Sequence, residues 1–289
     1  MQEINVQDAL QNSEFFSYLF GDFDVQNYLN EHKVHELFNV DISAASSKID
    51  KGLYLSVDPE NNEAFPVELD DLARLHYLIT SRKVTTILEF GVGKSTKAIG
   101  HALDINKAAH ADFVKENLRR SNPFELHSVD CMKEWIEVCQ KTIPAEFEKL
   151  VNIHYCPLEI GEFNGRMCTY YDQIPNICPD FIYLDAPDQF SAKGDIRGLS
   201  TAHPDRMPMA ADILTIEHFL ASGTLILVDG RTANARFLKC NLQRNWRYHY
   251  EESFDQHYFE LFEPPLGRIN KKQIEFSLKP SFLEDQKAL

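Results

Sequence analysis

Residues 86–96 read Thr-Ile-Leu-Glu-Phe-Gly-Val-Gly-Lys-Ser-Thr, an apolar run followed by a turn-forming segment. The apolar residues predict a buried strand. Gly91 and Gly93 let the backbone turn sharply and approach a ligand where a Cβ would collide. Glu89 stands at the end of the strand, aimed at the same crevice. The segment therefore predicts a strand, a turn that binds a nucleotide cofactor and the start of a helix.

The spacing of the glycines separates three classes of cofactor site. A phosphate-binding loop of the form Gly-x-x-x-x-Gly-Lys-[Ser/Thr] would need a glycine at Leu88, inside the strand. A dinucleotide fingerprint would need a third glycine at Thr96. The pattern that remains is [Glu/Asp]-x-Gly-x-Gly-x-[Gly/Ser], which ends at Ser95. Its acidic residue can pair with a cationic amine.

In residues 89–95 the chain resembles the class I S-adenosylmethionine-dependent methyltransferases, whose first motif has this form. The resemblance implies that Glu89 and the backbone of Gly91 and Gly93, together with Ser95, hold the methionine part of S-adenosylmethionine. It also implies that Asp130, at the end of the second strand, accepts hydrogen bonds from both ribose hydroxyls. Asp130 falls 37 residues after Gly93, farther than the roughly 20 that are typical.

Seven short apolar segments predict strands, and longer amphipathic stretches separate most of them. The segments are 84–89, 124–130, 151–156, 181–185, 224–229, 246–252 and 258–262. The last two are too close for a crossover helix, so they predict an antiparallel hairpin. The expected fold is α/β, a Rossmann-like, mostly parallel seven-stranded sheet that ends in this hairpin. Such a hairpin is typical of the methyltransferase sheet and is not expected of a dehydrogenase.

The chain divides into three parts by composition. Residues 1–66 are rich in aromatic, helix-like runs and predict an N-terminal helical cap, which either covers the active site or joins the chains of a homo-oligomer. Burial of its Phe/Tyr stripe against the main domain is the simpler account. Residues 67–280 predict the methyltransferase domain, with a helix over 67–80 and an added helical segment at 104–122. Residues 281–289 predict a tail, with fraying from Lys279.

Four of the expected strands end in a carboxylate, at the edge where open α/β sheets bind ligands. Besides Glu89 and Asp130, these are Asp185 and Asp229. The resemblance places Asp185 beside the cofactor and the reacting hydroxyl, and Asp229 beside the substrate. Residues 180–189 and 223–229 resemble the branch that methylates small molecules, sugars and natural products, in which the loop after the fourth strand commonly reads Asp-Gly-x-His. This chain has Asp-Ala-Pro-Asp over 185–188, without the histidine, and two aspartates alone fit a Mg²⁺ site poorly. A divalent metal is therefore disfavoured, though not excluded.

The long polar loop of residues 189–209 should overhang the methyl donor. His203 is a candidate for the general base, because its neutral form is available near pH 7, and Asp185 is the rival candidate. Arg197, Arg206 and Arg231 are candidates for binding an anionic group of the substrate. For His203 and for each arginine the alternative is an ordinary solvated side chain.

Composition limits the partners of the protein. The 289 residues carry a formal net charge of −15, which argues against nucleic acid. Residues 231–247 carry five arginines or lysines, which form either an anion-binding face or a solvated helix face. No apolar run has the length of a membrane span, and the N-terminus lacks the features of a signal peptide, so a cytoplasmic location is expected.

The reading that best fits these features is methyl transfer from S-adenosylmethionine to a hydroxyl of a small polar or sugar-linked metabolite. Two alternatives stay open. One is a non-catalytic module that keeps the cofactor fold as a scaffold, and the other, less favoured, is a nicotinamide-dependent oxidoreductase.

Overall fold

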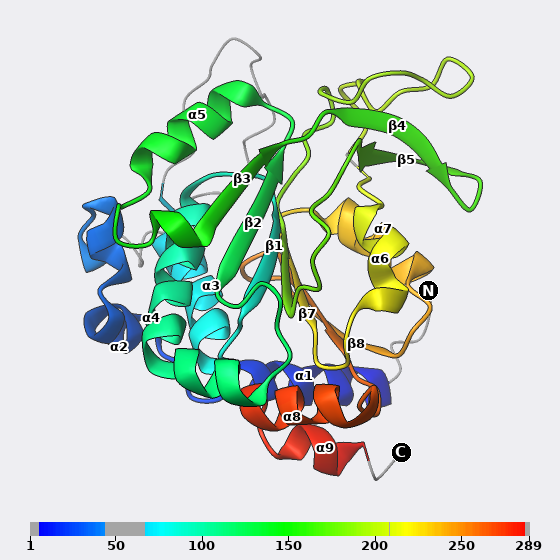
Figure 1. The fold of residues 1–289 in the computed structure, drawn as a ribbon. Helices are drawn as coiled ribbons and strands as arrows, with labels where there is room; N and C mark the ends of the chain where they lie inside the picture. The colour runs from blue at the N-terminus through cyan, green and yellow to red at the C-terminus, as the bar shows by residue number, and fades with distance from the viewer. Residues whose placement is uncertain (1–5, 44–66, 208, 287–289) are drawn as a thin grey trace.

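The computed structural model describes residues 6–43, 67–207 and 209–286. Seven strands form one sheet in the order β3-β2-β1-β6-β7-β9-β8 (Figure 1). They are β1 (Thr86–Phe90), β2 (Glu125–Asp130), β3 (Val151–Tyr155), β6 (Phe181–Leu184), β7 (Leu225–Asp229), β8 (Trp246–Glu251) and β9 (Gln256–Leu261).

Five strands of this sheet are parallel, whereas β9 is antiparallel to both β7 and β8. The expected mostly parallel sheet with a C-terminal hairpin is therefore confirmed. The hairpin is folded so that β9, and not β8, lies against β7.

The central strand β1 is buried along its whole length, as parallel strands covered on both faces are. On one face, α3 (Leu69–Ser81) and α4 (Lys94–Asn117) pack against Ile87. On the other, α6 (Asp212–Ile216) and α7 (Thr232–Asn241) pack against Leu88 and Phe90. Figure 1 shows these helices on opposite sides of the sheet, with α5 (Lys133–Thr142) beyond β3. The three layers leave the carboxyl ends of the strands as a shared edge.

The N-terminal residues form α1 (Val6–Phe20), α2 (Val25–His32) and the short 3-10 helix η1 (Val34–Phe38). From α1, Phe15 and Phe20 are buried in the same cluster as Tyr258 of β9. This arrangement matches the simpler account, in which the aromatic stripe packs on the chain's own domain. Residues 44–66 of the expected cap lie outside the described residues.

A second, two-stranded sheet was not predicted from the sequence. It pairs β4 (Leu158–Phe163) with β5 (Arg166–Tyr171) in an antiparallel hairpin. The turn consists of Asn164 and Gly165, both with positive φ, at 49° and 71°. Asn-Gly between two strand-like runs is a strong local hairpin signal, so the sequence did contain the information.

Two helical expectations are wrong. Residues 94–117 form one continuous helix, α4, so 104–122 is not a separate added segment. The chain does not fray from Lys279, since residues 281–285 form α9 (Ser281–Asp285) after α8 (Gly267–Ser277). Phe282 of α9 is fully buried, with its ring edge-on to Phe262. That buried ring is the physical reason for the order of the tail.

Candidate cofactor and acceptor site

The two glycines of the loop after β1 have different structural roles. Gly91 has a φ of 98°, and a Cβ built on it would lie only 2.7 Å from the Cβ of Ala186. Gly93 has extended backbone, with a φ of 178°, and a Cβ there would meet no atom within 4 Å. Gly91 is thus needed by the chain's own packing. The flank of Gly93 is open space at the carboxyl edge of the sheet.

Glu89 lies under this loop and is fully buried. Its carboxylate accepts hydrogen bonds from three hydroxyls, at 2.7 Å from Ser95, 2.8 Å from Thr96 and 2.5 Å from Ser128. Burial raises the pKa of Glu89 to about 7, against the opposing effect of these three donors. Thr96 Oγ1 also accepts from the backbone N–H of Gly93 at 3.0 Å. Glu89 therefore braces the loop from within.

Asp130, at the end of β2, is buried and joins two loops. Its carboxylate accepts from the backbone N–H of Val92 at 3.0 Å and of Met132 at 2.7 Å. Burial is the main reason that the pKa of Asp130 is raised. Because a carboxylate has about four lone-pair sites, these two bonds leave room for further donors.

Asp185 and Asp229 follow neighbouring strands, since Leu184 of β6 pairs in register with Val228 of β7. The Asp185 side chain is 54% exposed, and Nε of Arg231 lies 3.4 Å from its Oδ1. Asp185 is therefore the strand-end carboxylate that is open to an incoming molecule.

Asp229 is half-buried and accepts hydrogen bonds from the hydroxyl of Tyr183 at 2.7 Å and the amide of Gln256 at 3.2 Å. Burial raises the pKa of Asp229 to about 8, and the neighbouring carboxylates of Asp71 and Asp185 act in the same direction.

The loop of residues 189–209 forms backbone hydrogen bonds with the β4–β5 hairpin near both of its ends. The backbone of Lys193 bonds with Leu158 and Ile160 of β4, each at 2.9 Å, and Thr169 of β5 donates to the carbonyl of Met209 at 2.8 Å. The β4–β5 hairpin is thus the support of the loop that leads away from β6.

His203, Arg197 and Arg206 all lie on this loop. The His203 side chain is 52% exposed, and its Nδ1 accepts from the backbone N–H of Asp205 at 3.1 Å. Arg206 donates to the carbonyl of Ser200, and Arg197 is exposed with a φ of 59°. The His203 imidazole and the Arg206 guanidinium therefore make these hydrogen bonds within their own loop.

The basic run of residues 231–247 does not form a single face, and binding of an anion by any of its members stays a prediction. Arg231 lies against Asp185 at the carboxyl edge. Arg244 pairs with Glu263 at 2.7 Å, and Arg247 pairs with the buried Glu260. The hairpin of β8 and β9 carries the later arginines away from the site and gives them partners.

Several side chains of the site gave no signal in the sequence pattern. Ser128 and Tyr183 are interior strand residues. Thr96 entered the sequence analysis only as the position where a dinucleotide fingerprint would have its third glycine. Asp71 and Gln256 meet near Asp229 because α3 and β9 pack at the same edge. Contacts over such sequence separations have no local pattern from which to predict them.

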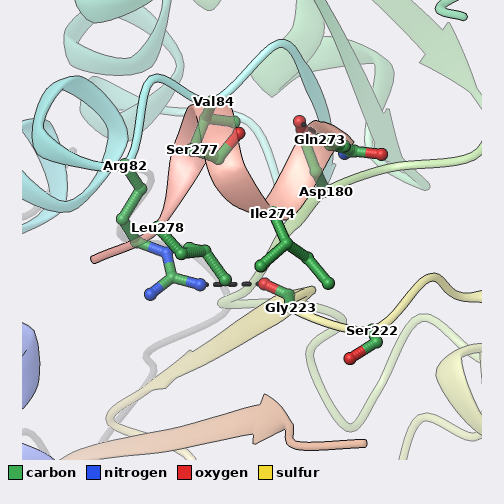
Figure 2. A pocket seen from close by; sticks show the side chains of 9 residues that line it. All are labelled: Arg82, Val84, Asp180, Ser222, Gly223, Gln273, Ile274, Ser277 and Leu278. Carbon is green, nitrogen blue, oxygen red and sulfur yellow. Dashed lines mark hydrogen bonds between the residues drawn. The ribbon is translucent and has the colours of Figure 1, made fainter. Parts of the chain in front are cut away.

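The cavity shown in Figure 2 lies at the other edge of the sheet, close to where β1, β6 and β7 begin. It holds about 20 Å³ and includes Arg82, which donates to the carbonyl of Gly223 at 2.8 Å. A larger cavity of about 400 Å³, between the end of α4 and the start of α8, is lined by exposed side chains such as Arg119 and Arg268. Neither cavity contains a predicted site residue.

Two further properties concern the described residues alone. Within 6–43, 67–207 and 209–286, no group of three or more His, Cys, Asp or Glu side chains is arranged to hold a metal ion. Across the same ranges, no helix is both long and apolar enough to span a membrane.

No protein-family model and no curated protein matches the chain. Several solved structures align with most of it, among them the following three. The O-methyltransferase TomG from Streptomyces achromogenes, involved in tomaymycin synthesis and bound to SAM, is 14% identical over 90% of this chain and 99% of its own, with a TM-score of 0.37. An O-methyltransferase from Bacillus cereus, in complex with SAH, is 11% identical over 87% and 98%, with a TM-score of 0.38. An SAH-bound methyltransferase from Podospora anserina is 11% identical over 91% and 99%, with a TM-score of 0.33.

At this identity and these scores, the likeness decides neither the fold nor the function. Both rest on the chain's own topology and site.

Proposed function

We propose that this protein is an S-adenosylmethionine-dependent O-methyltransferase that acts on a hydroxyl of a small polar or sugar-linked metabolite. The observation that carries the proposal is the antiparallel strand β9, inserted between β7 and β8, in a sheet whose first strand runs into the Gly91–Gly93 loop. A dinucleotide-binding Rossmann sheet has six strands in the order 3-2-1-4-5-6 without such an insertion. The topology thus favours the methyltransferase over the oxidoreductase.

The residues at the carboxyl edge fit the methyl donor. The open flank of Gly93 leaves space for a ligand against the loop, and the loop itself is held by Glu89 from beneath. Glu89, Gly91, Gly93 and Ser95 would hold the methionine part, as the sequence predicted. Asp130 would accept hydrogen bonds from the ribose hydroxyls. When bound, the cofactor supplies a methyl group on a sulfonium centre. The protein has to align this group with the acceptor.

On the acceptor side, Asp185 is the first candidate for removing the proton of the hydroxyl. It is partly open and stands on the end of a rigid strand, which makes its position independent of the long loop. Asp229 and Arg231 would line the same side of the crevice. His203 is the second candidate for the base, and Arg197 and Arg206 would bind an anionic group if the acceptor carries one.

The experiment that tests the function is ligand binding to the full chain. S-adenosylhomocysteine, but not NAD, should raise the melting temperature, because a ligand at about 100 times its Kd adds roughly 2.7 kcal/mol to the stability. Stabilisation by NAD alone would instead favour a nicotinamide-dependent oxidoreductase. Stabilisation by neither would contradict the proposal.

A further inference from the structure

A buried polar network lies behind the strand-end aspartates, between α3 and β9. Gln256 is the first residue of β9, pairs in register with Asp229 and is fully buried. From α3 come Asp71 and Arg74, each only 5% exposed. These side chains come from distant parts of the sequence and meet at the carboxyl edge of the sheet.

The orientation of the Gln256 amide follows from its neighbours. The hydroxyl of Tyr258 donates to Oε1 at 2.6 Å, and Nε of Arg74 donates to it at 3.3 Å. A guanidinium N–H can only donate, so the oxygen of the amide must face Arg74. The amide NH₂ then donates to the Oδ1 atoms of Asp229, at 3.2 Å, and Asp71, at 3.4 Å.

Both of the donors to Asp229, the Tyr183 hydroxyl and the Gln256 amide, are neutral. The charged and titratable groups that act on Asp229 are Asp71 on α3, Asp185 after β6 and Tyr258 on β9. Two arginines lie one contact farther away, Arg74 against Gln256 and Arg231 against Asp185. Arg74 is paired with Asp71, and Arg231 lies against Asp185. Within the part of the chain that the structure describes, the Gln256 amide is therefore one of two side chains that donate to Asp229 and can stabilise its ionised form.

We propose that Gln256 is a positioning residue of the acceptor side: its amide holds the Asp229 carboxyl beside Asp185 and sets the pH at which this pair of strand-end aspartates takes up a proton. This inference rests on the proposed function, in which the pair lies where the proton of the acceptor hydroxyl is released. Without the amide, an ionised Asp229 loses a hydrogen bond where burial and like charge already disfavour it.

The test is the titration of Asp229 in the full chain, followed through the ¹³C NMR signals of the side-chain carboxyl carbons. Asp229→Asn assigns the signal. Gln256→Met keeps a similar volume without the amide, and it should raise the titration midpoint of Asp229 by about 1 pH unit or more. An unchanged midpoint in the folded variant overturns the proposal.

Two more variants make the test decisive. Gln273→Met is the matched control, because it removes an amide that donates at 3.4 Å to Asp180 at the opposite edge of the sheet. It should leave the midpoint unchanged. If Gln256→Met does not fold, Tyr258→Phe takes its place, since it frees one side of the Gln256 amide. A smaller rise is then expected, and no rise overturns the proposal equally.

The titration requires neither cofactor nor acceptor, so the two proposals fail separately. A protein that shows the shift but is not stabilised by S-adenosylhomocysteine loses the methyltransferase assignment and keeps the role of Gln256 in the titration. A protein that transfers methyl groups but shows no shift loses the role of Gln256 alone.

Discussion

Nε of Arg231 lies 3.4 Å from Oδ1 of Asp185, although the two residues belong to the ends of different strands. The same guanidinium donates to the carbonyl of Pro187. Arg231 therefore holds the candidate base and the start of the long loop in one place. We expect Arg231 to position Asp185, in addition to any contact that it makes with an anionic acceptor.

Substitutions of the arginines at the site should affect different kinetic constants, kcat for Arg231 and KM for the two loop arginines. Arg231→Lys loses the fork geometry that reaches both Asp185 and Pro187, so it should lower kcat. Arg197→Lys or Arg206→Lys should raise the KM of an anionic acceptor and leave kcat unchanged. Arg236→Lys, exposed on α7, is the control. If the KM of the acceptor in both loop variants equals that of the parent protein, the acceptor is neutral or its charge is bound elsewhere.

The general base can be assigned by comparing two variants. His203→Ala should reduce turnover by about 10²–10⁴-fold if His203 takes the proton, and Asp185→Asn should do so if the carboxylate has that role. We expect the larger loss in Asp185→Asn, because Nδ1 of His203 already accepts a hydrogen bond from the backbone of its own loop. Binding of S-adenosylhomocysteine to His203→Ala should be unchanged. Full turnover in both variants would mean that the acceptor needs no base from either residue.

Asp130→Ala should weaken binding of S-adenosylhomocysteine at least about tenfold. The reason is the loss of hydrogen bonds to a charged group, each worth on the order of 1.5–3 kcal/mol. Isothermal titration calorimetry measures the change. Asp112→Ala, which removes an exposed carboxylate from the distal part of α4, is the control. Unchanged affinity in folded Asp130→Ala would remove this residue from the cofactor site.

The two glycines of the loop should respond differently to the same methyl group. Gly91→Ala places a Cβ 2.7 Å from Ala186 at a positive φ, which should destabilise the fold by at least about 1–2 kcal/mol. Gly93→Ala meets no atom, so its melting temperature should stay close to that of the parent protein. Its affinity for S-adenosylhomocysteine should nevertheless fall. Unaltered affinity would show that the ligand does not use this flank.

The buried Glu89 should make stability depend on pH. Its folded pKa of about 7 lies above the usual 4.5, so the folded state holds the proton more tightly than the unfolded state. The contribution of Glu89 to stability is then fully present below about pH 4.5 and is lost as the pH rises through about 7, by an amount on the order of 3 kcal/mol. Glu89→Gln should abolish this loss, as measured by urea unfolding at pH 5 and pH 8. An identical pH dependence in both proteins would contradict the prediction.

The sheet was the most predictable part of the molecule. The central strands β1, β6 and β7 are short, largely apolar runs, because strands that are buried on both faces require such runs. The hairpin followed from the shortness of the link between β8 and β9. One error concerned α4, where the local composition does not show that the helix is continuous. The other concerned α9, whose order depends on the burial of a single ring, that of Phe282.

The candidate site was predictable only as far as the ends of its strands. Parallel strands bring their carboxyl ends to one edge, so Glu89, Asp130, Asp185 and Asp229 had to share it. The partners of these carboxylates were not predictable. Ser128, Thr96 and Gln256 reach them through the packing of different elements.

The sequence by itself therefore determined the α/β class, the glycine turn and the four strand-end carboxylates, because strand burial and turn chemistry are local in the chain. Tertiary structure alone decided which of those carboxylates is open. Glu89 is closed off by three hydroxyls, Asp229 is held by a tyrosine and an amide, and Asp185 is left half exposed beside Arg231. The physical reason is that desolvation and hydrogen bonding depend on every element packed around a group, including those far away in the sequence.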